Sequence, residues 1–115
     1  MSFIDKSNND NMSSFGNYIR AQREQNGLLL REVAMHIGID TPMLSKVERG
    51  VRKLKREKLK KLSKVLQVEE KTLTTLWLAE RIYSTLKDEE FGKDALKAAE
   101  EELTYHARSS KRKKN

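Results

Sequence analysis

The sequence has no cysteine, one proline and five glycines in 115 residues, and only 6% of it is aromatic. The absence of cysteine excludes a disulfide framework, a thiol nucleophile and a cysteine-ligated metal site. No apolar run approaches the roughly 18 residues of a membrane-spanning helix, and the first residues do not have the pattern of a signal peptide. We therefore expect a cytoplasmic protein that has no membrane partner and consists of one small domain plus an extension.

Charge is unevenly distributed along the chain, whose formal net charge is +7. Residues 52–68 hold eight basic side chains and one acidic, whereas residues 69–107 hold five basic and ten acidic. Residues 108–115 hold five basic side chains and none acidic. Phosphate contact is favoured by the first of these segments and disfavoured by the second. We predict that the polar residues 1–12 are a disordered leader and that residues 108–115 are a disordered basic tail.

The chain is organised around a predicted pair of short helices joined by a tight turn. Val33 and Ile37, spaced i,i+4, give the first helix an apolar face. Gly38 follows, and a glycine in the left-handed conformation commonly ends a helix. Asp40 is a good N-cap for a second helix, and Pro42 suits the first turn of that helix because its missing N–H costs little there.

The second helix of the pair has a polar and basic outer face. Leu44 and Val47, spaced i,i+3, predict its buried side. A short helix with small, polar and basic residues outward fits a DNA major groove. The alternative is a generic helical hairpin, which would not require this combination of residues. The outward residues are Thr41, Pro42, Met43, Ser45, Lys46 and Arg49.

Further helices are predicted on both sides of this pair. Apolar residues at helical spacing indicate helices over residues 13–25, 58–66 and 68–87, and an additional helix begins after Asp88. No proline separates the last two, so they are either two helices or one bent helix. No strand pattern is present, so we predict an all-α fold with a domain at residues 13–78 and a helical extension at residues 79–107.

The helix pair and its flanks resemble the Xre/Cro family of helix-turn-helix regulators, also called lambda-repressor-like domains. The resemblance covers about residues 15–78 and implies a bacterial protein with a five-helix DNA-binding domain. It also implies a homodimer whose third helices enter the major groove of double-stranded DNA at a palindromic operator. The residues that carry it are Gly27, Leu28, Val33, Ala34, Gly38, Ile39, Asp40, Leu44, Ser45, Glu48 and Gly50.

The sequence departs from the family pattern at two places. Leu29 and Leu30 replace the usual Thr-Gln at the start of the second helix, where the glutamine often contacts phosphate or supports the recognition helix. We expect the neighbouring Arg31 to take over the phosphate contact. Leu54 replaces the usual proline after the motif, which leaves the geometry of the loop at residues 51–57 open.

The resemblance also assigns roles at the DNA. Lys46 can donate to guanine O6 or N7, and Thr41 or Pro42 can pack on a thymine methyl group. Met43 either packs inside the domain or contacts a base. The basic residues after this helix are expected at phosphates, and the alternative for them is a solvated basic face. The predicted base contacts are Thr41, Pro42, Ser45 and Lys46, and the predicted phosphate contacts are Arg31, Arg49, Arg52, Lys53 and Lys55.

The other chemically distinctive residues have structural interpretations. The resemblance implies an ion pair between Arg23 and Glu48, which makes Glu48 a structural residue and not an acid catalyst. Trp77 belongs either to the core or to a dimer contact. His36 and His106 lack neighbouring ligands, so we expect no metal site, no cofactor and no enzymatic activity.

The extension at residues 79–107 has three interpretations. It dimerises through an edge that contains Phe91, Leu96 and Leu103, it docks a different protein such as a toxin, or it covers the domain's own core. We therefore expect a homodimeric transcriptional regulator, with a restriction-modification controller as one sub-class. The alternative is an antitoxin with autoregulatory DNA binding.

Overall fold

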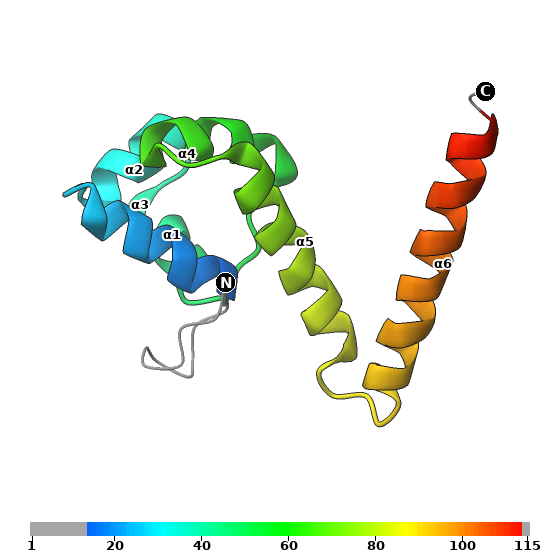
Figure 1. The fold of residues 1–115 in the computed structure, drawn as a ribbon. Coiled ribbons are helices and arrows are strands. Elements are labelled where there is room, and N and C mark those ends of the chain that lie inside the picture. The colour runs from blue at the N-terminus through cyan, green and yellow to red at the C-terminus, as the bar shows by residue number, and fades with distance from the viewer. Residues whose placement is uncertain (1–13, 114–115) are drawn as a thin grey trace. The chain divides into compact units, whose positions relative to one another are not determined.

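The computed structural model describes the backbone of residues 14–113 and the side chains of residues 14–108. This part of the chain contains only helices and connecting loops, so the all-α prediction is confirmed (Figure 1). The predicted leader, residues 1–12, lies outside the described residues. The helices are α1 (Ser14–Gln25), α2 (Leu30–Ile37), α3 (Thr41–Glu48), the short 3-10 helix η1 (Arg56–Lys58), α4 (Leu59–Leu66), α5 (Glu70–Leu86) and α6 (Gly92–Lys113).

The chain divides into two compact units, Met1–Glu80 and Arg81–Asn115, and the division falls within α5. In the first unit, α2 packs against α3 and α4, and α1 packs against the same two helices. Ala34 is 1% exposed, as expected of a small residue where two helices cross closely. The core side chains of this unit are Phe15, Ile19, Val33, Ala34, Ile37, Leu44, Val47, Leu54, Leu59, Leu62, Leu66, Leu73, Leu76 and Trp77.

The first four α-helices end with the same hydrogen-bond motif. At the end of α2, Ile39 N–H donates to the Ala34 carbonyl at 3.0 Å and Gly38 N–H donates to the Met35 carbonyl at 3.3 Å. This pair of bonds is a Schellman motif, which needs a residue in the left-handed conformation. The motif stops each helix at a defined residue and so fixes where α3 begins. The left-handed residues are Gly27, Gly38, Gly50 and Gln67.

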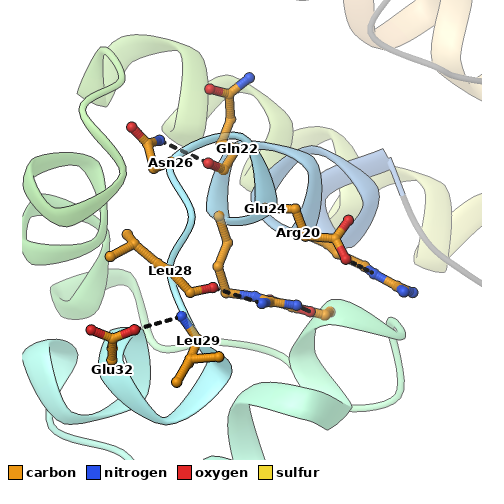
Figure 2. Close-up of polar contacts among 9 residues, drawn as sticks. Arg20, Gln22, Glu24, Asn26, Leu28, Leu29 and Glu32 are labelled. Atoms are coloured by element: carbon orange, nitrogen blue, oxygen red, sulfur yellow. Dashed lines mark hydrogen bonds and ion pairs between the residues drawn. The ribbon is translucent and has the colours of Figure 1, made fainter.

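The start of α2 shows what the departure from Thr-Gln does to the fold. Leu29 occupies the N-cap position, and its side chain cannot accept a hydrogen bond from the first turn. The Glu32 carboxylate instead accepts a hydrogen bond from the Leu29 N–H at 2.8 Å (Figure 2). This is one half of a capping box. Helix α2 therefore begins at Leu30 even though the side chain of its N-cap residue supplies no hydrogen bond.

In the second unit, α5 ends at Leu86 and α6 begins at Gly92, so the chain forms two helices and not one bent helix. Gly92 N–H donates to the Glu89 carbonyl at 3.2 Å. A Cβ atom on Gly92 would lie 2.7 Å from the Leu86 carbonyl oxygen, so this turn excludes a larger residue. The helix therefore begins after the turn and not directly after Asp88.

The backbone of residues 108–113 belongs to α6, which ends at Lys113. The predicted disordered tail covers residues 108–115, of which residues 108–113 have a helical backbone here and residues 114–115 lie outside the described residues. No glycine or proline follows Gly92 to interrupt this helix. In addition, basic residues near a helix carboxyl end are favoured by the helix dipole.

Candidate nucleic-acid interface

Helix α3 is fixed by its cap and by its buried side. The Asp40 carboxylate accepts a hydrogen bond from the Met43 N–H at 2.7 Å, and Pro42 lies in the first turn. Leu44 is 0% exposed and Val47 is 1% exposed. The cap and the apolar contacts together set both the start and the rotation of the helix. The face of α3 that carries Pro42 and Lys46 is therefore held pointing away from the core.

The outer face of α3 combines fully exposed and partly exposed side chains. Pro42 and Lys46 are exposed, whereas Thr41 and Ser45 are partly buried. Met43 is also partly buried and packs against the apolar core. Of the two interpretations left open for Met43, this position favours packing over base contact.

An ion pair holds the end of α3 to α1. Arg23 Nε lies 2.8 Å from one carboxylate oxygen of Glu48, and Arg23 Nη2 donates to the other at 3.1 Å. The two side chains are 13% and 7% exposed. The hydrogen bond to Glu48 raises the pKa of Arg23, although burial acts in the opposite direction. The ion pair that the resemblance implies is therefore present, and it is bidentate and mostly buried.

The same arginine also fixes the loop between α1 and α2. Its Nη1 donates to the Leu28 carbonyl at 3.0 Å, and Figure 2 shows this carbonyl between the two helices. Arg23 thereby connects α1, the α1–α2 loop and the end of α3. Sequence periodicity alone gives no sign of this triple connection, because Arg23 and Glu48 lie on different helices.

The basic loop after α3 is tied back to that helix. The N–H groups of Val51 and Arg52 donate to the Lys46 carbonyl at 2.9 Å and 3.3 Å. Leu54 is 2% exposed, and its carbonyl accepts a hydrogen bond from Trp77 Nε1 at 2.7 Å. The loop whose geometry the sequence left open is thus held at both ends. Trp77 is 7% exposed and belongs to the core.

The residues predicted to contact phosphate are exposed cations on the helix pair and in the loop after it. Arg31 is exposed in the first turn of α2, and Arg49 is exposed just after α3. Within the described part of the chain, none of the predicted cations forms an ion pair with an acidic side chain. Their charge is therefore free to attract phosphate. The cations of the loop itself are Arg52, Lys53 and Lys55, all exposed.

Lys58 has a position that the sequence did not reveal. A Cβ atom on Gly38 would lie 3.3 Å from Lys58 Nζ, so this ammonium group is close to the turn between α2 and α3. A cation near the carboxyl end of α2 is favoured by the helix dipole. The basic segment that follows the helix pair in sequence therefore also places a cation, Lys58, next to the turn between α2 and α3.

The predicted dimerisation residues lie in the second unit. Phe91 is 68% exposed, Leu96 is 39% exposed and Leu103 is 71% exposed. Tyr105, which was not part of the prediction, is 68% exposed. The second unit therefore carries several exposed apolar and aromatic side chains.

The described residues do not form a metal site of the usual kind. Over this range, no three histidine or acidic side chains are grouped so that they could hold a metal ion. No described helix is both long enough and apolar enough to span a membrane. The candidate site is therefore α3, a capped helix whose outer face is flanked by exposed cations.

Comparison with known proteins identifies the first unit. Residues 19–73 match the helix-turn-helix family model. Two uncharacterized HTH-type transcriptional regulators, from two strains of Mycobacterium tuberculosis, are each 40% identical to the chain over 58 residues. The match covers 50% of this chain and 41% of each relative, so the chain matches less than half the length of these relatives. The fold of residues 19–73 is therefore that of a helix-turn-helix domain of the lambda-repressor-like, or Xre/Cro, type.

Proposed function

We propose that the protein is a sequence-specific transcriptional regulator of the bacterial cytoplasm that binds a palindromic operator in double-stranded DNA as a homodimer. The observation that carries the proposal is the contrast between the two sides of α3. Leu44 and Val47 are buried, whereas Pro42 and Lys46 are exposed without an acidic partner among the described residues. Such a helix presents side chains to base edges at a fixed rotation.

In the proposed complex, the outer face of α3 reads the DNA sequence. Lys46 donates to a guanine, and Thr41, Pro42 and Ser45 contact neighbouring base edges or thymine methyl groups. The cations around α3 contact phosphates, which orient the domain on the duplex without reading sequence. They are Arg31, Arg49, Arg52, Lys53 and Lys55.

Dimerisation through the second unit would place two copies of α3 about one DNA turn apart. The exposure of Phe91, in the turn before α6, and of Leu103, on α6, at 68% and 71%, supports this role because exposed apolar surface can mark a protein–protein interaction site. A restriction-modification controller is one sub-class that fits a small regulator of this kind.

The proposal is tested by selecting bound sequences from a random duplex library, together with light-scattering measurement of the protein's mass. A homodimeric regulator enriches a two-fold symmetric sequence whose half-sites are about one helical turn apart. Enrichment of no sequence would contradict specific recognition, and a monomeric mass with one unpaired half-site would contradict the dimer.

A second candidate function is an antitoxin that neutralises a partner protein through the second unit and regulates its own gene through the first. The same exposed apolar side chains favour it, since they fit a foreign surface as well as a second copy. Gel filtration of the chain with the protein encoded beside it distinguishes the two. A stoichiometric complex supports the antitoxin, and independent elution supports the regulator.

A further inference from the structure

The loop between α3 and η1 is anchored at two points with cations between them. At its start, the N–H groups of Val51 and Arg52 share the Lys46 carbonyl. At its end, Leu54 is buried and its carbonyl accepts the Trp77 indole hydrogen bond at 2.7 Å. Lys53 lies between the anchors and is exposed. The loop therefore displays its cations from a fixed backbone.

Trp77 supplies the second anchor from a distant part of the sequence. It lies on α5, is 7% exposed and is the one tryptophan of the chain. The guanidinium of Arg56 lies over its ring, 5.7 Å from the ring centroid. The indole thus contacts the loop end through a hydrogen bond and η1 through a cation–π interaction. Packing alone requires neither contact, since a phenylalanine ring would also fill an apolar core.

We propose that Trp77 is a positioning residue for phosphate binding, which acts on DNA through Arg52 and Lys53 of the loop after α3. The inference rests on the proposed DNA-binding function and adds a residue that does not itself touch DNA. Without the indole N–H, the buried Leu54 carbonyl loses its partner and the loop gains conformational freedom. Binding then has to order Arg52 and Lys53 before they reach phosphates, which weakens affinity.

The experiment compares Trp77→Phe with the wild type in binding to a labelled random-sequence duplex over a range of salt concentrations. We expect Trp77→Phe to bind about threefold to tenfold more weakly, the range that corresponds to one hydrogen bond. We also expect the slope of log affinity against log salt to become shallower by about 0.9 for each phosphate that the variant no longer binds. A purely structural role would not change this slope while the protein stays folded.

A double-mutant cycle shows whether Trp77 acts through the loop. In an Arg52→Ala/Lys53→Ala background, Trp77→Phe should weaken binding no further, because the residues that it positions are absent. Leu73→Val is the matched control. It removes a methylene from a fully buried α5 residue without altering the Leu54 hydrogen bond, so the affinity and the slope should both stay unchanged.

The outcomes separate this inference from the proposed function. Wild-type affinity in Trp77→Phe, or an equal loss with and without Arg52 and Lys53, overturns the positioning role while the proposed function stands. A wild-type protein that fails to bind DNA overturns both. If Trp77→Phe does not fold, Leu54→Val loosens the same anchor from the loop side, and the same cycle decides the question.

Discussion

Lys46 and Glu48 lie two positions apart on α3, and their surroundings differ completely. Lys46 is exposed and has no acidic partner among the described residues, whereas the Glu48 side chain is 7% exposed and bound by Arg23. The Lys46 charge is available to a ligand, whereas the Glu48 charge stabilises the fold through its ion pair with Arg23. Each of these roles makes a separate prediction.

Replacing Lys46 by alanine should reduce discrimination between the selected operator and random DNA. The expected loss is about 1–3 kcal/mol in the specificity ratio, because a donor to a base edge disappears. Lys71→Ala, at an exposed position on α5, is the control and should leave the ratio intact. Competition binding at fixed salt measures both, and an unchanged ratio for Lys46→Ala would remove its base-reading role.

Replacing Glu48 by glutamine should destabilise the first unit. The substitution leaves the Arg23 charge mostly buried without its counter-ion, which costs roughly 2–4 kcal/mol. Glu24→Gln makes the same change in the exposed Arg20–Glu24 pair, whose side chains are 50% and 57% exposed, and should cost less than about 1 kcal/mol. Denaturant unfolding compares the two, and equal costs would show that the Arg23–Glu48 pair is no more important than a surface pair.

At the scale of helices, the repeated Schellman ends determine where each element stops. Gly38 lets α2 end where Asp40 can cap α3, so the helix pair depends on the left-handed residue between its two halves. The end of α4 uses Gln67 at φ 57° in the same role. A side chain in this conformation is strained, because its Cβ approaches backbone atoms.

Gln67→Gly should therefore stabilise the protein. Removing the Cβ from a left-handed residue relieves about 1 kcal/mol, less the entropy that glycine adds to the unfolded chain. The same substitution at Gln25, which lies in the last turn of α1, should instead cost about 0.5–1 kcal/mol. Thermal unfolding of the two variants should show shifts of opposite sign, and a lower midpoint for Gln67→Gly would contradict the assigned backbone conformation.

The helix pair was predictable from sequence because its signals are local. Asp40 caps α3 and Gly38 ends α2, as the residue types indicated. The Schellman end at Gln67 was not predictable, since glutamine gives no signal for a left-handed conformation.

The loop after α3 was not predictable for a different reason. Leu54 lies within a run of basic residues, and its carbonyl is bound by Trp77, which lies 23 positions further along the chain. The exposed position of Lys46 followed from periodicity, and the Arg23–Glu48 pair followed only from family resemblance. Contacts between distant parts of the sequence are therefore what sequence patterns missed.

At the scale of the whole molecule, the proposed function assigns DNA binding to the first unit and dimerisation to the second. The first unit has a closed apolar core, whereas the second exposes Phe91, Leu96 and Leu103. Leu96 and Leu103 are spaced i,i+7 on α6, a spacing typical of the apolar face of a helix that packs against a partner. This division predicts that association can be broken without unfolding the DNA-binding domain.

Leu96→Lys/Leu103→Lys should give a folded monomer with much weaker operator binding. Two charges on the apolar edge oppose burial against a second copy, while the first unit keeps its core. Met35→Lys, at a position 75% exposed on α2, is the control and should remain dimeric. Sedimentation measures the mass of both variants, and an intact dimer in the double variant would assign this edge to another partner.

The central claim is that the outer face of α3 and the loop after it meet DNA. An amide NMR titration of the full chain with the selected duplex tests this claim most directly. We predict that the largest shift changes fall on residues 41–55, with smaller changes near Arg31. Changes confined to the second unit, with residues 41–55 unaffected, would contradict the account.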